Sequence, residues 1–311
     1  MSGRVVVVLT GGVGGAKLVL GLSRMMPAVA ITAIVNTGDD FRHFGLAVSP
    51  DIDTLLYTLS GKANAAQGWG REGETWSFMA ALRSLAGEDW FQLGDGDLAL
   101  HVLRSFALAR GETLSGITGK FARSWGIGTA VLPMSDDAVA TLLSTDAGEL
   151  AFQDYFVARR CAPVVREIRF RGAEAARPGP GVLEAIAACE TILIAPSNPF
   201  LSIDPILAVP GIRQALASAR APVVAVSPIV GGTAVKGPTA KLMHELGLAI
   251  TPGAIAAHYR GIIDGLLVDE RDEPEALGVT FAATDTLMQS LEDRIRVAEA
   301  ALALARRLRD E

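Results

Sequence analysis

The sequence contains little cysteine, no long apolar run and no excess of basic residues. Its two cysteines, Cys161 and Cys189, cannot supply the four ligands of a structural zinc site by themselves, and so few are typical of a reducing compartment. No stretch of about 20 apolar residues is present, so we expect no membrane-spanning helix. The 28 Lys and Arg against 34 Asp and Glu give a net charge of −6, which argues against a broad cationic surface for nucleic acid. We therefore expect a soluble, cytoplasmic globular protein that binds neither membranes nor nucleic acid.

Short β-branched runs alternate along the chain with amphipathic runs, a pattern typical of βαβ units around a parallel sheet. The runs that we expect to form strands are residues 5–9, 30–35, 191–195, 223–227 and 265–268. The runs that we expect to form helices are residues 16–26, 182–189, 212–219, 239–246 and 286–308. Most of residues 54–125 have a helical pattern, and residues 138–145 and 149–157 alternate as the two strands of a hairpin do.

This organisation predicts an α/β fold: a Rossmann-like, doubly wound and mostly parallel sheet with a helical and β insertion. We assign residues 1–60 and 181–311 to the core of the fold. Residues 61–180 form the predicted insertion, which we expect to cover part of the functional site. Because the insertion is apolar and the C-terminal helix is long, we expect a homodimer.

A glycine-rich segment joins the first predicted strand to the first predicted helix. It contains Gly11, Gly12, Gly14, Gly15 and Lys17. Glycine lets the backbone approach a phosphate group closely, and a helix N-terminus offers free N–H groups to it. The segment lacks the Gly-Lys-Ser/Thr ending of a Walker A loop, and Lys17 occupies a position where the dinucleotide-binding fingerprint has glycine. We predict that the segment binds phosphate groups; the alternative is a tight strand–helix turn without a ligand.

Four aspartates follow the second predicted strand: Asp39, Asp40, Asp51 and Asp53. Carboxylates that converge beside phosphate groups are typical ligands of Mg²⁺. The alternative is that Asp51 only caps the next helix and that Asp40 is solvated. We predict a Mg²⁺ ion on Asp39 and Asp53, although their spacing does not single out this pair. Asp40 or Asp51 is then the candidate acceptor of a proton from an attacking hydroxyl group.

Polar residues also follow other predicted strands. Because ligands bind outside the carboxyl ends of parallel strands, we expect a nucleotide to contact the following residues: Asn36, Ser197, Asn198, Ser227 and Pro228.

A separate acidic motif, Leu93-Gly94-Asp95-Gly96-Asp97, precedes His101 by one helical turn. We interpret it as a turn followed by a His–Asp pair on the surface. The alternative is that Asp95, Gly96 and Asp97 line a substrate pocket.

The ordered set of motifs resembles the 2-phospho-L-lactate transferases of coenzyme F-420 biosynthesis. Further matching segments are Gly68-Trp69-Gly70, Pro133-Met134-Ser135-Asp136-Asp137 and Phe152-Gln153-Asp154. The resemblance implies a guanosine-diphospho-linked three-carbon acid as donor (lactyl, enolpyruvyl or glyceryl), the deazaflavin Fo as acceptor, and GMP as a product. It also implies Mg²⁺ on Asp39 and Asp53, and a guanine nucleotide near the glycine-rich segment and the loops at Ser197 and Ser227.

One position departs from this resemblance. The family usually has arginine where this chain has Gly96, and that arginine is associated with deazaflavin binding. Losing a planar cation there leaves the contact with the acceptor unassigned.

Two other classes of protein share part of the pattern. A nucleotide-binding regulator of the gluconeogenesis-factor type also has a glycine-rich first loop and an acidic second loop. That family typically continues Asp-Asp-Gly-Gly-Ser, whereas this chain has Asp39-Asp40-Phe41-Arg42-His43, which favours the transferase. An NAD-dependent dehydrogenase is disfavoured because the dinucleotide-binding fingerprint is absent.

Overall fold

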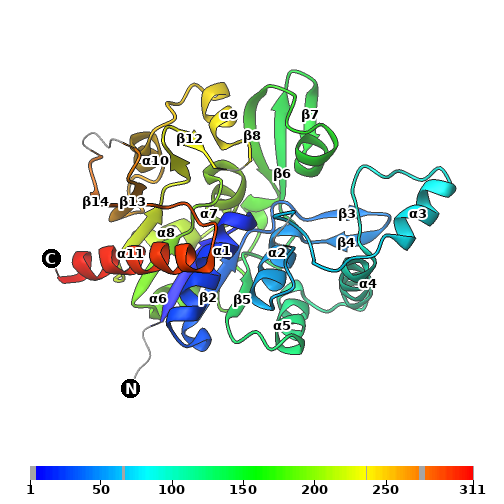
Figure 1. Cartoon of the computed structure of the whole chain (residues 1–311), viewed down its shortest axis with the longest axis horizontal. Helices are drawn as coiled ribbons and strands as arrows, with labels where there is room; N and C mark the ends of the chain where they lie inside the picture. The colour runs from blue at the N-terminus through cyan, green and yellow to red at the C-terminus, as the bar shows by residue number, and fades with distance from the viewer. Residues whose placement is uncertain (1–4, 65–66, 236, 273–276, 311) are drawn as a thin grey trace.

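The computed structural model describes residues 5–64, 67–235, 237–272 and 277–310. Its centre is a seven-stranded parallel sheet with the strand order β14-β13-β10-β9-β1-β2-β5 (Figure 1). The strands are β1 (Val6–Thr10), β2 (Ile31–Val35), β5 (Ala130–Pro133), β9 (Thr191–Ile194), β10 (Val223–Val226), β13 (Gly265–Asp269) and β14 (Thr280–Thr284). The order reverses between β1 and β9, so the predicted doubly wound α/β fold is confirmed.

The sheet is covered on both faces, which explains the run of valines in β1. Val6 and Val8 pack into the apolar cluster on one face, whereas Val7 and Leu9 pack into the cluster on the other. A strand buried on both faces has no polar side, as expected for a parallel sheet. The first face is covered by α1 (Gly12–Met25), α2 (Pro50–Leu59), α5 (Leu114–Ser124) and α11 (Leu291–Asp310). The second is covered by α6 (Val182–Ala188), α7 (Asp204–Ala208), α8 (Ile212–Ala217), α9 (Thr239–Glu245) and α10 (Pro252–His258).

Two groups of smaller elements extend from this core (Figure 1). One contains the antiparallel hairpin β3 (Phe41–His43) and β4 (Leu46–Val48), with α3 (Ser77–Ser84) and α4 (Asp95–Ala109). The other is a three-stranded sheet of β6 (Ala140–Thr145), β7 (Gly148–Ala151) and β8 (Val165–Arg171) in the order β7-β6-β8. Short remaining elements are the hairpin β11 (Ile229–Val230) and β12 (Thr233–Ala234), and the turns η1 (Ala28–Ala30), η2 (Asp154–Ala158), η3 (Ala173–Ala175) and η4 (Pro199–Ile203).

Several details differ from the sequence-based expectation. The predicted hairpin at residues 138–157 forms, but its second strand ends at Ala151 and continues as η2, because the buried rings of Phe152 and Tyr155 are spaced for a helical turn. β14 was not predicted because none of its residues is fully buried, and the β3–β4 hairpin was not predicted because each of its strands has only three residues. Within residues 61–180, β5 joins the central sheet beside β2. No helix in the described ranges is both long and apolar enough to cross a membrane.

Candidate functional site

The segments that leave the carboxyl ends of β1 and β9 touch each other where the strand order reverses. The Ser197 hydroxyl accepts a hydrogen bond from the Gly11 N–H (3.2 Å) and donates one to the Gly11 carbonyl oxygen (2.7 Å). Ligands of doubly wound sheets bind in the crevice at this point. The structure therefore brings together two strand-end segments that the sequence singles out.

The glycine-rich segment forms the first turn of α1. This helix begins at Gly12, earlier than the predicted start at residue 16, and Gly11 is its N-cap residue. A Cβ atom on Gly14 would lie 2.7 Å from the Pro196 carbonyl oxygen, and one on Gly15 would overlap the Thr10 hydroxyl. Glycine is thus required here by close packing. A helix N-terminus favours an anion, and here the Gly12 N–H already donates to the Asp51 carboxylate.

Asp51 lies in the first turn of α2, and its carboxylate connects that helix to α1 and β2. Its Oδ1 accepts a hydrogen bond from the Gly12 N–H (2.7 Å), and its Oδ2 accepts one from the Asn36 side-chain amide (3.0 Å). Burial raises the pKa of Asp51 to about 6, although these hydrogen bonds act to lower it. Asp51 therefore joins three segments of the site, which goes beyond the capping role considered from the sequence.

Asn36 positions the loop that carries the first two aspartates. Its amide also donates to the Leu201 carbonyl oxygen (3.3 Å), and its Oδ1 accepts a hydrogen bond from the Gly38 N–H (2.7 Å). The predicted residue is thus at the site, and its polar atoms already have partners within the protein.

Asp39 and Asp40 each have one buried carboxylate oxygen without a hydrogen-bond donor in the described part of the chain. These atoms are Oδ1 of Asp39 and Oδ1 of Asp40, while Oδ2 of Asp40 accepts a hydrogen bond from the Ser49 hydroxyl (2.6 Å). Burial raises the pKa of both carboxyl groups well above their ordinary range, and the nearby Asp51 charge raises it further. Unsatisfied buried acceptors of this kind fit a bound cation.

Asp53, the other predicted metal ligand, is engaged with Arg104. The guanidinium contacts both carboxylate oxygens: Nη2 pairs with Oδ1, and Nη1 lies 3.1 Å from Oδ2. Both side chains are buried, and Nη1 also donates to the Ala47 carbonyl oxygen (3.3 Å). A cation from the protein thus already balances the charge of Asp53.

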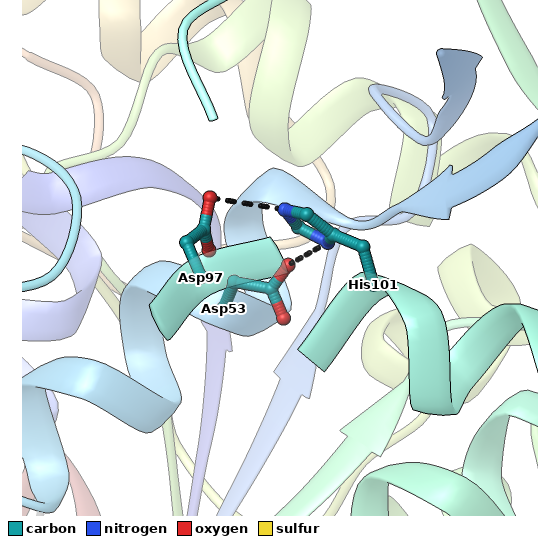
Figure 2. A group of neighbouring side chains, drawn as sticks. All are labelled: Asp53, Asp97 and His101. Carbon is teal, nitrogen blue, oxygen red and sulfur yellow. Dashed lines mark hydrogen bonds and ion pairs between the residues drawn. The ribbon is translucent and has the colours of Figure 1, made fainter. Parts of the chain in front are cut away.

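His101 lies between two carboxylates, from α2 and α4 (Figure 2). Its Nε2 is 3.0 Å from Oδ2 of Asp97, and its Nδ1 is 3.7 Å from Oδ2 of Asp53. The predicted His–Asp pair is confirmed, but its predicted surface position is wrong for His101, which is 1% exposed. Burial acts to raise the pKa of Asp97, but contacts with His101 and Tyr57 outweigh it, so the pKa is lowered.

The group of Asp53, Asp97 and His101 could itself hold a metal ion. One ligand atom from each residue lies within 4.8 Å of the others. However, Nη1 of Arg104 lies 3.3 Å from Nδ1 of His101, so a metal on the Asp53 side would be next to a guanidinium. Coulomb repulsion between two buried cations opposes this arrangement. The free oxygens of Asp39 and Asp40 are the other candidate metal ligands.

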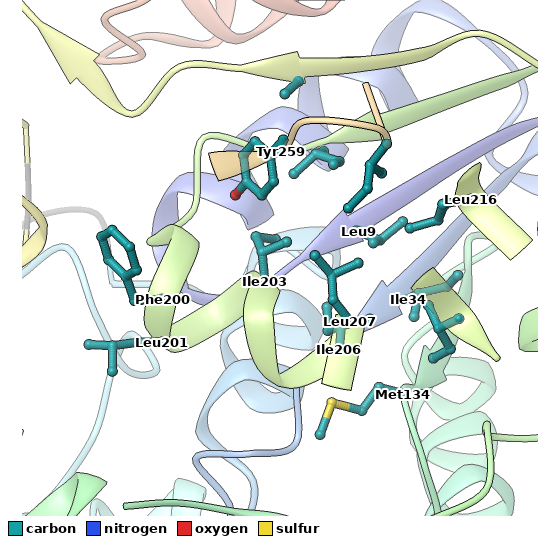
Figure 3. Close-up of a cluster of buried hydrophobic side chains, with 14 of the residues drawn as sticks. Leu9, Ile34, Met134, Phe200, Leu201, Ile203, Ile206, Leu207, Leu216 and Tyr259 are labelled. Carbon is teal, nitrogen blue, oxygen red and sulfur yellow. The ribbon is translucent and has the colours of Figure 1, made fainter. Parts of the chain in front are cut away.

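The loop after β9 is anchored in the apolar core by η4. Phe200, Leu201 and Ile203 of η4 are buried in the cluster shown in Figure 3. Oδ1 of Asn198 caps this turn by accepting hydrogen bonds from the N–H groups of Phe200 (3.0 Å) and Leu201 (3.1 Å). Its amide nitrogen is buried and has no acceptor among the described residues, so it remains available to a ligand.

The remaining predicted nucleotide-binding residues lie further from this cluster. Ser227 and Pro228 follow β10, which is separated from β1 by β9, and the Ser227 hydroxyl accepts a hydrogen bond from the Ile229 N–H (3.1 Å). The Lys17 ammonium donates to the Met288 carbonyl oxygen (2.5 Å), near the start of α11. Their contact with a nucleotide stays a prediction.

The acidic motif of residues 93–97 forms the start of α4. Asp95 accepts hydrogen bonds from the N–H groups of Ser77 (3.1 Å) and Phe78 (3.0 Å) and so caps α3. In return, the buried Glu74 carboxylate accepts hydrogen bonds from the N–H groups of Gly96 (2.6 Å) and Asp97 (2.9 Å). The alternative that Asp95, Gly96 and Asp97 line a substrate pocket stays a prediction.

No motif in the sequence singles out Arg104, Tyr57 or Glu74. The Tyr57 hydroxyl donates to Oδ1 of Asp97, at the same carboxylate that His101 contacts. A helical signal for Arg104 was available, because Asp97, His101 and Arg104 are spaced to share one face of a helix.

Comparison with known proteins gives consistent matches along the whole chain. The family model for 2-phospho-L-lactate transferase CofD matches residues 6–302. A phosphoenolpyruvate transferase of Kitasatospora aureofaciens is 45% identical over 316 residues, covering 98% of each chain. A 2-phospho-L-lactate transferase of Methanosarcina mazei is 39% identical over 298 residues, covering 94% of this chain and 98% of the relative.

Among solved structures, a UPF0052-family protein of Bacillus halodurans matches with a TM-score of 0.64. The match has 20% sequence identity and covers 97% of this chain and 99% of the other. At this level of identity the likeness concerns the fold alone.

Proposed function

The chain belongs to the 2-phospho-L-lactate transferase CofD family, and from this we propose that it transfers a phosphorylated three-carbon acid from a guanosine-diphospho donor to the terminal ribityl hydroxyl of the deazaflavin Fo. GMP is the leaving group. The observation that carries the proposal beyond family membership is the free, buried oxygens on Asp39 and Asp40. Both carboxyl groups lie near the charge of Asp51, which accepts a hydrogen bond from the Gly12 N–H at the start of α1. An anion site beside a cation site is what a pyrophosphate donor requires.

The donor phosphates bind at the first turn of α1, with the loop after β9 closing the other side. The N–H groups at a helix N-terminus and the helix dipole favour negative charge at this turn. The free amide nitrogen of Asn198 donates a further hydrogen bond. These fixed N–H groups hold the phosphates of the substrate in line for displacement. Such positioning is the main task of a protein in phosphoryl-type transfer.

A divalent cation, Mg²⁺ in our proposal, supplies charge stabilisation for the phosphate oxygens when it is bound. The sequence predicts Asp39 and Asp53 as its ligands. The structure favours Asp39 with Asp40, because both oxygens of Asp53 contact Arg104. Arg104 then holds Asp53 in place and limits the negative charge around the two ligands.

Asp51 accepts the proton of the attacking hydroxyl in this proposal. Its pKa of about 6 leaves it ionised at neutral pH, and a base with a pKa near the working pH is efficient. Asp40 is the alternative left open by the sequence, but burial raises its pKa well above the ordinary range, which favours its protonated form when no cation is bound.

The donor carries the enolpyruvyl group in preference to the lactyl or glyceryl group. Support comes from the names of the relatives: the phosphoenolpyruvate transferase of Kitasatospora aureofaciens is 45% identical, and the 2-phospho-L-lactate transferase of Methanosarcina mazei is 39% identical. We also propose that the protein acts in the cytoplasm and that it forms a homodimer. Light scattering on the purified protein tests the homodimer.

The experiment is a turnover assay with purified protein, Mg²⁺, Fo and each of the three guanosine-diphospho donors, alone and in competition. Mass spectrometry should detect a phosphodiester of Fo together with GMP. In competition, the product from the enolpyruvyl donor should be the most abundant. Failure to form a phosphodiester from any donor would contradict the proposed reaction. Nucleotide binding without turnover would instead indicate a regulator, and hydride exchange would indicate a dehydrogenase.

A further inference from the structure

Gly96 lies against the guanidinium of Arg71. A Cβ atom at position 96 would overlap Nη1 of Arg71 and would lie 3.0 Å from Oε1 of Glu74. The side chain of Arg71 thus occupies the space into which a side chain at position 96 would project. The observed position of Arg71 therefore requires glycine at position 96.

The position of Arg71 is fixed by a reciprocal pair of helix caps. Glu74, which is buried, accepts the N–H groups of Gly96 and Asp97 at the start of α4, and its Oε1 lies 3.1 Å from Nη1 of Arg71. Asp95 of α4 in turn accepts hydrogen bonds from the start of α3. The segment between these caps is therefore fastened to α4 on both sides, so the guanidinium has little freedom to move away.

Arg71 is still available to a ligand. Its side chain is 29% exposed, whereas that of Glu74 is 6% exposed. A guanidinium has five N–H donors, and the contact with Glu74 uses only Nη1. A planar, partly exposed cation of this kind can stack on a flat ring or donate to its carbonyl edge.

Polar contacts connect this cation to the buried aspartates. From Arg71 they pass through Glu74 and Asp97 to His101, which lies beside Asp53. Arg71 is thus at the outer end of a continuous network whose inner end is at the candidate transfer site.

We propose that Arg71 binds the ring of the acceptor; this inference rests on the proposed function. The reacting hydroxyl of the acceptor is at the far end of a five-carbon chain from its ring, so the ring must be held away from the aspartates that surround the transfer. The side chains of Glu74, Asp97 and His101 lie between Arg71 and Asp53 in the network. The Arg71 guanidinium fills the space into which a side chain at position 96 would project, and so places a planar cation there.

Exposed aromatic side chains flank the same segment. Trp69 is 52% exposed and Trp76 is 37% exposed, so neither is a core residue. Both lie within five positions of Arg71 in the sequence, and exposed large apolar side chains are typical of a surface that binds a ligand.

The test compares Arg71→Ala with the exchange variant Arg71→Ala/Gly96→Arg. Arg71→Ala should raise the KM for Fo by about 10-fold or more and leave the KM for the donor within about twofold, because one charge-assisted contact is lost. The exchange variant should recover most of the affinity, since removal of the first guanidinium opens the space for the second. Arg71→Lys should be intermediate, because it keeps the charge and loses the planar donor set. Arg83→Ala, on exposed α3, is the matched control and should behave as wild type.

Binding of Fo alone, followed by its fluorescence, separates this inference from the proposed function. If the wild type transfers no group from any donor, the proposed reaction fails, but the effect of Arg71→Ala on Fo binding still tests the contact. An active wild type together with unchanged Fo binding and KM in Arg71→Ala would overturn the inference. So would equal losses for Fo and donor accompanied by a lowered Tm, since these indicate a structural role.

Discussion

Replacing Arg104 with methionine should destabilise the protein by about 3–5 kcal/mol, the usual cost of removing one partner from a buried ion pair. Arg104 is 1% exposed and contacts both carboxylate oxygens of Asp53. Methionine replaces much of the aliphatic stem, so the main loss is electrostatic: the Asp53 carboxylate stays buried, and among the described residues His101 (3.7 Å) remains as its ion-pair partner. Since a domain is stable by about 5–15 kcal/mol in total, the effect is large.

The double variant Arg104→Met/Asp53→Asn distinguishes this reason from a simple loss of packing. Asparagine has nearly the shape of aspartate and carries no charge, so the double variant buries no unpaired ion. We expect it to be more stable than Arg104→Met alone, although it carries one substitution more. Urea unfolding followed by tryptophan fluorescence gives the midpoints and slopes. A double variant less stable than the single one would refute the reasoning.

The single variants Asp53→Asn and Asp39→Asn test the choice of metal ligands. Saturating Mg²⁺ at about 100 times its Kd should stabilise the wild type by about 2.7 kcal/mol. If Asp39 and Asp40 hold the ion, Asp53→Asn keeps this stabilisation and Asp39→Asn loses it. Loss of the Mg²⁺ effect in Asp53→Asn would instead support the pair predicted from the sequence.

Three further changes have defined outcomes. Gly15→Ala places a methyl group on the Thr10 hydroxyl, so it should lower the free energy of unfolding by about 1–3 kcal/mol and raise the KM for the donor. The control Gly119→Ala, in α5, should leave both the Tm and the KM for the donor near wild type. Asp39→Asn should lower kcat at least about 100-fold at saturating Mg²⁺ in the transfer assay, as expected for a lost transition-state contact. In the presence of EDTA, Asp51 alone should contribute a loss of up to about 3 kcal/mol of stability as the pH rises from 4 to 6, because the folded state keeps a proton on Asp51, with a pKa of about 6, that the unfolded chain has already released. Urea titrations at each pH give this contribution as the difference in slope between the wild type and Asp51→Asn, since both retain Asp39 and Asp40.

The sequence by itself determined the sheet and the neighbourhood of the site. Four consecutive valines leave β1 no polar face, which requires cover on both sides. Because the carboxyl ends of parallel strands meet at one edge, the order of strands and polar loops predicts that Gly11, Asn36 and Ser197 lie close together. Hydrogen bonds from Ser197 to Gly11, and from Asn36 to Asp51, confirm this.

Only the tertiary structure decided which charges meet. Helical spacing puts His101 and Arg104 on one face of α4. It does not predict that this face packs against Asp53 of α2, which lies 51 positions before Arg104 in the chain. The contact of Arg71 with Gly96 has no sequence signal either, since it depends on two caps that form after α3 and α4 have docked. Periodicity describes one element at a time, whereas the partner of a buried charge is chosen by how separate elements pack.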